Sequence, residues 1–435
     1  MMYIDNILFA IILLAGIGFF AKNVKKLSRN IKLGQEVNRT DNPSARWKNM
    51  AMIALGQSKM VKRPIAGFLH IIVYVGFVII NLEVLEIIID GLFGTHRIFS
   101  FLGGFYGILI GSFEVLAVLV LVAVIAFWIR RNVIRLQRFA SPDLKGAPKK
   151  DADTILYFEI VLMSLFLIMN ATDLQFQAMN SGNIISQYLN PWFSSLSIVQ
   201  VEIVERAAWW FHIIGILIFL NYLYYSKHLH ILLAFPNTYF ADLNAKGKFD
   251  NLESVTKEVK LMMDPNADPF AAQPVDENAV PSKFGASDVQ DLNWVQLLNA
   301  YTCTECGRCT SSCPANQTSK KLSPRKIMMD TRDRLEEVGR NIDTNKGVFV
   351  PDNKSLLNDY ITTEELWACT SCNACVEECP VNISPLSIIM DMRRYLVMEQ
   401  SAAPQSLNAM MTNIENNGAP WQYNQQDRLN WKDEN

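Results

Sequence analysis

Two groups of cysteines are the part of this sequence in which residue type and spacing most directly indicate chemistry. The chain has eight cysteines, and all of them fall in two copies of one pattern, C-x2-C-x2-C-x3-C-P. The copies are Cys303, Cys306, Cys309 and Cys313, followed by Cys369, Cys372, Cys375 and Cys379. This spacing is typical of thiolates that hold [4Fe–4S] clusters. The sequence therefore predicts two such clusters.

The assignment of the thiolates to the two clusters follows from the paired pattern. In such runs the first three thiolates bind one cluster and the fourth binds the other. We therefore expect a first centre held by Cys303, Cys306, Cys309 and Cys379, and a second centre held by Cys369, Cys372, Cys375 and Cys313. The alternatives are zinc, which usually takes two cysteine pairs or histidine, and disulfides, which need an oxidising compartment.

The composition separates the chain into an apolar half and an ordinary polar half. Of the 435 residues, 50% are hydrophobic and 19% are charged, and the net charge is −2. This balance offers no basic surface for nucleic acid, so we exclude that partner. The apolar excess lies before residue 235. We expect the cysteine-bearing half to be cytoplasmic, because cluster assembly needs a reducing environment.

Five apolar stretches are long enough to cross a bilayer, by the criterion of about 20 residues. They are 4–21, 65–90, 104–129, 154–171 and 207–226. Loops 22–64 and 130–153 carry eleven and seven Lys/Arg, whereas loop 91–103 carries one and loop 172–203 none. Basic loops mark the cytoplasmic side. We therefore expect a multi-pass protein of the prokaryotic inner (cytoplasmic) membrane, with its N-terminus outside.

Histidines near both ends of the membrane stretches are candidate haem ligands, because ionisable groups at such positions are usually functional. His212 and His230 are 18 residues apart, so on one continuous helix they share a face about 27 Å apart. We expect His70 and His230 to bind an inner b haem. An outer haem would use His212, and His96 is the remaining candidate for its partner. The sequence thus predicts one or two haems; hydrogen bonds between helices are the alternative role.

Acidic residues cluster toward the outer end of the second apolar stretch, at Glu83, Glu86 and Asp90. A quinol oxidised there must release two protons, and carboxylates near an outer haem would accept them. The alternative is that these residues reach interfacial water without any chemistry. A quinone is therefore a further candidate ligand.

The cysteine patterns are flanked by predicted helices. We expect helices at 252–263, 291–300, 324–337 with Ser323 as N-cap and Gly339 as its stop, and 385–398 with Ser384 as N-cap. Thr362 and Glu365 form a capping box before Cys369. Residues 264–286 are predicted to be a linker or strap, and 340–360 a loop-rich insert.

These elements predict an all-α fold, with a five-helix transmembrane bundle and a cytoplasmic α-helical ferredoxin domain. The expected domains are a cytochrome b-like membrane domain (1–235), a linker (236–287), a ferredoxin with two [4Fe–4S] clusters (288–400) and an extended C-terminal arm (401–435). The two patterns are 66 residues apart, which suits a helical ferredoxin better than a compact β-rich one.

The segment WWFHIIGILIFLNYLYYSKHLHI (209–231) resembles the last membrane helix of the respiratory nitrate reductase gamma subunit family. That family carries two haem histidines 18 residues apart, which correspond here to His212 and His230. Its second helix carries two more, ten residues apart. Of these only the first has a counterpart, His70, and the second position is Ile80.

The segments CTECGRCTSSCPANQTSKKLSPRKI (303–327) and CTSCNACVEECPVNISPLSIIMDMRR (369–394) resemble the C-type iron–sulfur module of heterodisulfide reductases, which holds two [4Fe–4S] clusters. The whole chain is similar to a fusion of that module with the cytochrome b subunit of membrane-bound heterodisulfide reductases. Those enzymes complete catalysis on a subunit with CCG motifs. This chain has no CCG motif, so the resemblance implies a catalytic site on a partner.

Together these features predict a membrane-anchored electron-transfer subunit that works between the quinone pool and a cytoplasmic partner. The partner would be a CCG-type or flavin-containing oxidoreductase subunit in a hetero-oligomer, because the sequence has no Gly-rich dinucleotide fingerprint of its own. The alternatives are an ion-pumping redox module and a non-enzymatic tether or redox sensor.

Overall fold

The computed structural model describes residues 4–266 and 283–433. Within these ranges the chain forms helices and turns, with two isolated bridges and no strand. Five helices are long and apolar enough to cross a membrane, as the sequence predicts. They are α1 (Ile4–Ile31), α3 (Pro64–Phe93), α4 (Gly104–Asn132), α5 (Ala147–Thr172) and α8 (Ile198–Tyr222). The all-α fold class is therefore confirmed.

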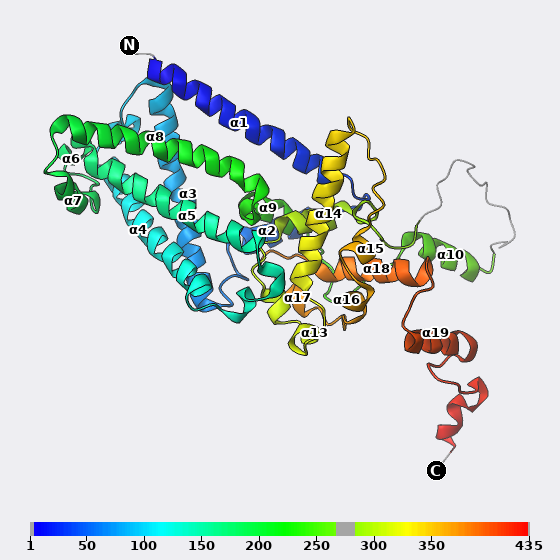
Figure 1. Cartoon of the computed structure of the whole chain (residues 1–435). Helices are drawn as coiled ribbons and strands as arrows, with labels where there is room; N and C mark the ends of the chain where they lie inside the picture. Colours follow the sequence, from blue (N-terminus) through cyan, green and yellow to red (C-terminus); the bar gives the residue numbers. More distant parts are fainter. Residues whose placement is uncertain (1–3, 267–282, 434–435) are drawn as a thin grey trace.

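The five helices form the membrane bundle, in which α4 and α5 lie between α3 and α8 (Figure 1). α1 packs along α3 and α8, where Phe9 contacts Trp209 and Trp210. The side chain of Ser197 and that of Gln200 form a capping box that begins α8. Local capping and the apolar lengths thus fix where the long helices start.

The last membrane helix differs from the prediction in one respect that matters for the histidines. α8 ends at Tyr222 and is followed by two short 3-10 turns, Leu223–Tyr225 and Lys227–Leu229. Ser226 between them is extended, with φ −119° and ψ 148°, and its side chain accepts a hydrogen bond from His228 N. His230 therefore begins a separate helix, α9 (His230–Tyr239), and the expectation of one continuous helix through His212 and His230 is wrong.

The helices around the cysteines begin where their caps predict. Ser323 caps α14 (Pro324–Thr344), Thr362 and Glu365 form the capping box of α16 (Thr363–Trp367), and Ser384 caps α18 (Pro385–Met398). The remaining helices of the chain are short: α2 (Pro43–Met50), α6 (Leu174–Ala178), α7 (Ser186–Leu189), α10 (Glu253–Met263), α11 (Trp294–Thr302), α12 (Arg308–Ser311), α13 (Pro314–Gln317), α15 (Leu356–Asp359), α17 (Ala374–Glu378) and α19 (Gln405–Asn417).

Two expectations for this half are corrected. Gly339 does not end α14, which continues to Thr344; a Cβ at this glycine would lie 2.5 Å from Asn30 Nδ2, so the glycine allows α1 to approach. The arm after residue 400 is not extended, because it contains α19 and a 3-10 helix, Gln425–Lys432. The predicted linker 264–286 falls mostly on 267–282, outside the described residues.

The membrane bundle and the cysteine-bearing part, which we call the cysteine module (283–400), touch each other. α1 packs against α11 and α14 beside one end of the bundle (Figure 1). Asn30 Nδ2 donates to Tyr301 Oη (2.8 Å), and Gln35 pairs with the backbone before α11 through Gln35 N to Leu292 O (2.8 Å). The cysteine module is therefore held directly against the membrane bundle.

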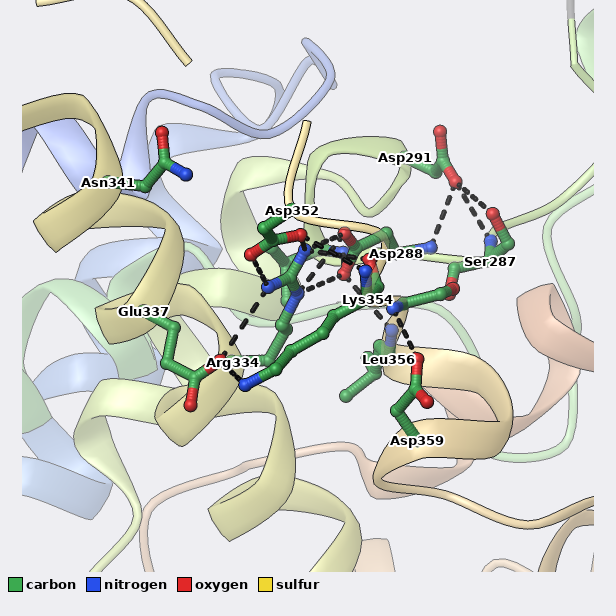
Figure 2. Close-up of polar contacts among 12 residues, drawn as sticks. Ser287, Asp288, Asp291, Arg334, Glu337, Asn341, Asp352, Lys354, Leu356 and Asp359 are labelled. Atoms are coloured by element: carbon green, nitrogen blue, oxygen red, sulfur yellow. Dashed lines mark hydrogen bonds and ion pairs between the residues drawn. The ribbon is translucent and has the colours of Figure 1, made fainter. Parts of the chain in front are cut away.

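Inside the module, Arg334 of α14 connects the segments that precede the two cysteine patterns (Figure 2). Its side chain is fully buried, and it lies 2.8 Å from the carboxylate of Asp288 and 2.6 Å from that of Asp352. It also donates to Lys354 O at 2.8 Å. The hydrogen bond from Arg334 holds the pKa of Asp352 below its ordinary value. One guanidinium thus fixes the chain before both patterns.

Replacing this arginine should destabilise the module strongly. In Arg334→Met the two carboxylates lose their shared partner, and breaking a buried ion pair costs about 3–5 kcal/mol. We expect the purified full-length chain to lose its iron–sulfur absorption at a clearly lower denaturant concentration. Arg340→Gln, an exposed substitution on the same helix, should change stability by no more than about 0.5 kcal/mol. Equal midpoints for both variants would contradict this role of Arg334.

Candidate functional site

The two cysteine patterns have the same local backbone. In each, the residues two and four positions after the first cysteine have left-handed φ angles: Glu305 (53°) and Gly307 (72°) in one, Ser371 (57°) and Asn373 (60°) in the other. Non-glycine residues rarely adopt this conformation unless their surroundings enforce it. The short helices α12 and α17 follow and pack against each other. The repeated spacing is therefore a repeated structure.

A small pocket between the two patterns gathers thiols from both. It is lined by Cys303, Cys306 and Cys309, together with Cys375 and Cys379. Cys379 comes from the second pattern but lies with the first three cysteines. Burial raises the pKa of Cys309 well above its ordinary value, and the neighbouring Cys306, Cys303 and Cys379 raise it further. These neighbours are the ones that the crossed assignment predicts for the first centre.

The other four thiols form a second group. Burial raises the pKa of Cys375 to about 12, with further contributions from Cys369, Cys313 and Cys372. Thiols that burial and crowding keep protonated become thiolates when they bind metal, because a bound cation favours deprotonation. Cys372 is exposed, whereas Cys303, Cys313, Cys375 and Cys379 are buried.

The spacing of these groups bears on the kind of metal. Among the residues that the structure describes, no three His, Cys, Asp or Glu side chains are close enough together to hold a single ion. A zinc ion draws its sulfur ligands to about 2.3 Å. Thiols that surround a wider space therefore fit a multi-iron cluster better than a lone zinc.

His70 and His230 face each other, with ring centres 6.5 Å apart. Two imidazoles bound to opposite sides of one metal, each about 2 Å from it, have ring centres about 6 Å apart. His230 Nδ1 lies 3.1 Å from Lys227 O, which leaves Nε2 available, and His70 Nδ1 is buried without a hydrogen-bond partner. Burial lowers the pKa of His230 and favours the neutral, metal-binding form. This pair fits an iron with two axial imidazoles.

The other two predicted haem ligands lie in different surroundings. His212 is 1% exposed; its Nδ1 is 3.0 Å from Leu162 O, and its ring lies against Phe166. His96 Nε2 lies 3.1 Å from the carboxylate of Asp173 and is partly exposed. The structure thus gives His96 an acidic partner and does not bring it to His212. The pairing of His96 with His212 stays a prediction.

Sequence reasoning missed His228, because it assumed a continuous helix on which this residue points away from His230. The break at Ser226 instead brings the two rings to 5.4 Å. Lys227 was missed as well: its side chain contacts Glu305, which lies between Cys303 and Cys306. The SKHLH sequence hints at this only through its density of polar residues after an apolar run.

The predicted acidic cluster lines a pocket at the other end of the bundle. Glu83, Glu86 and Asp90 face it from α3, and Trp209 and Trp210 face it from α8. Tyr106 Oη donates to Glu86 at 2.9 Å. Glu83 is 2% exposed, and its Oε2 has no hydrogen-bond partner. An acid that has been buried at this cost is a functional candidate.

Comparison with known proteins agrees with this chemistry. Residues 299–383 match the family described as a 4Fe-4S dicluster domain. The chain is 30% identical to the probable iron-sulfur-binding oxidoreductase FadF of Bacillus subtilis, over 99% of this chain and 61% of that protein. It is 25% identical to the EtfAB:quinone oxidoreductase of Syntrophomonas wolfei, over 94% of this chain and 57% of that protein.

A shorter match covers the cysteine module. It is 31% identity to the C-type subunit of a CoB-CoM heterodisulfide reductase of Methanosarcina acetivorans, over 25% of this chain and 53% of that protein. No solved structure matches significantly. The chain spans about 60% of the length of its two long relatives. It is a membrane protein similar over nearly its whole length to iron–sulfur oxidoreductases, and it carries a 4Fe-4S dicluster domain at residues 299–383.

Proposed function

We propose that the chain is a membrane-anchored electron-transfer subunit. It connects the quinone pool, through one or two b haems and two [4Fe–4S] clusters, with a cytoplasmic oxidoreductase subunit of the CCG or flavin type. The observation that carries the proposal is a chain of contacts between the histidine pair and the first cysteine pattern. His230 contacts Lys227 through a hydrogen bond, and Lys227 contacts Glu305 between Cys303 and Cys306.

The residues of this chain would supply ligands and their surroundings. His70 and His230 are the proposed ligands of the inner haem, and the crossed cysteine sets are those of the two clusters. When bound, these groups supply one-electron carriers. Lys227 O accepts the hydrogen bond from His230 Nδ1 and so orients the imidazole, as the outer partners of metal-binding histidines do. Buried side chains around the cysteines keep water away.

The exposed Cys372 supports a site for partner docking. The second centre thereby has a thiol at the surface, while the first centre faces the membrane bundle through Lys227 and Glu305. A partner subunit would approach the Cys372 side. The names of the relatives, such as EtfAB:quinone oxidoreductase, describe assemblies of several components and support a hetero-oligomer.

The acidic pocket supports a quinol site at the opposite end of the bundle. Its aromatic side chains, Trp209 and Trp210, suit a flat ring, and Glu83 has a free buried oxygen. Glu83, Glu86 and Asp90 would accept the protons that a quinol releases. His212 and His96 remain the candidate ligands of an outer haem near this pocket.

We also propose the orientation and the domain division that the sequence predicts. The two Lys/Arg-rich loops face the cytoplasm of a prokaryote, which puts the N-terminus outside. Residues 1–235 form the cytochrome b-like domain, 236–287 the linker, 288–400 the ferredoxin, and 401–435 an arm for which helical structure replaces the extended form.

Spectroscopy on the purified full-length protein in detergent tests the proposal. We expect absorption bands of a low-spin b haem, two iron–sulfur signals, and a change in the haem bands when a quinol analogue is added. Haem-free protein with intact clusters would instead favour a tether or redox sensor. Haem bands that stay unchanged with quinol analogues would contradict the quinone part of the proposal.

A further inference from the structure

Arg308 is a buried cation without an acidic partner. It lies between Cys306 and Cys309 and is 2% exposed. Its guanidinium donates to Lys59 O (3.1 Å), to Met60 O (3.2 Å) and to Met60 Sδ (3.0 Å). Among the described residues no carboxylate lies within ion-pair distance of it, whereas the buried Arg325 and Arg334 each have one.

Lys59 of the membrane half is a second such cation at the same place. Its Nζ lies 3.3 Å from Cys379 O and 3.4 Å from Val376 O, and it is half-buried. In the part of the chain that the structure describes, Lys59 forms no ion pair. Its neighbours Lys62 and Arg63 do, with Glu377 and Glu378.

Two cations without counter-charges are unfavourable together in a partly buried place. Both contact the backbone or the flanks of cysteines assigned to the first centre: Arg308 lies next to Cys309, and Lys59 contacts Cys379. Four thiolates around a [4Fe–4S] cluster carry net negative charge, which would supply the missing counter-charge. The positions of the cations are therefore explained by a negatively charged group at the first centre.

We propose that Lys59 and Arg308 are the counter-cations of the first centre and that they raise its reduction potential. This inference rests on the proposed function, because it takes the cluster and its four thiolates as given. Reduction adds one electron from an external reductant such as dithionite and breaks no bond, so the site becomes more negative by one charge. Nearby fixed positive charges stabilise that reduced state more than the oxidised state.

The second centre has fewer such charges. Arg393 is the cation beside it, donating to Cys369 O (2.5 Å) and to Leu366 O (3.0 Å). Lys59 also belongs to a loop of the membrane half, which leads into the helix of His70. The membrane half thus contributes directly to the electrostatics of the first centre and not of the second.

Potentiometric titration followed by electron paramagnetic resonance tests this on the full-length protein. The two signals are first assigned with Cys306→Ser and Cys372→Ser. At the potential that half-reduces the first centre in the wild type, Lys59→Gln should lower its ratio of reduced to oxidised form about tenfold, or about 59 mV for a one-electron couple. Arg308→Gln should lower it further.

The control variants separate charge from packing. Lys59→Arg should restore the wild-type potential, and Lys62→Gln, which removes a neighbouring cation that already has a partner, should leave it unchanged. If Arg308→Gln fails to assemble the first centre, the Lys59 series decides. Unchanged potentials in Lys59→Gln, or an equal shift in the second centre, would overturn the inference. Absence of both cluster signals from the wild type would instead contradict the proposed function.

Discussion

A Cys313→Ser variant should lose the second centre and keep the first. Cys313 follows Cys303, Cys306 and Cys309 in sequence, but its thiol lies with those of Cys369, Cys372 and Cys375. Serine is a poor ligand for iron in such a cluster, so one of two clusters should be lost, and with it about half of the bound iron. Iron analysis and electron paramagnetic resonance of the purified protein measure both effects.

Cys379→Ser is the matched control, since it is the fourth cysteine of the other pattern. Its thiol lines the pocket of Cys303, Cys306 and Cys309, so we expect the first centre to be lost and the second retained. The two variants should therefore leave complementary signals. If Cys313→Ser abolished the signal of the first centre alone, each pattern would hold its own cluster and the crossed assignment would be wrong.

His230→Ala should remove the inner haem and leave both iron–sulfur signals. The ring of His230 faces that of His70 at 6.5 Å, and a low-spin b haem needs an imidazole on each face. Loss of one axial ligand should remove most of the haem absorbance per protein, or convert the remaining haem to a high-spin spectrum. Optical spectra and a pyridine haemochrome assay measure this.

His228→Ala is the natural comparison, because its ring lies 5.4 Å from that of His230 in the same short segment. It should retain the haem. His212→Ala tests the outer haem separately: a second loss of absorbance would indicate two haems, and no loss would leave one. Normal haem content in His230→Ala, with loss in His228→Ala, would move the inner ligand to His228.

Much of the architecture follows from local features of the sequence. Apolar stretches of about 20 residues predict the membrane helices, since backbone groups in lipid must be satisfied within a helix. Caps at Ser323, Thr362 and Ser384 predict where helices begin, because their side chains accept bonds from the first free N–H groups. The cysteine spacing predicts cluster chemistry because a cubane needs thiolates at fixed intervals.

Other features depend on what each segment meets in space. The sequence predicts Gly339 as a helix stop, but this glycine is a contact point for Asn30, which is 309 positions earlier in the chain. The extended conformation of Ser226 ends the regularity on which the shared face of His212 and His230 depended. Neither outcome has a local signal, since both depend on a partner surface.

By itself the sequence determined the class of fold, the number of membrane helices and the eight thiols, because length, hydropathy and spacing act over short distances along the chain. Only the tertiary structure decided that His70 meets His230, that Cys379 lies with the first pattern, and that Lys59 reaches it from the membrane half. These contacts join residues far apart in sequence, and packing of the two halves against each other brings them together.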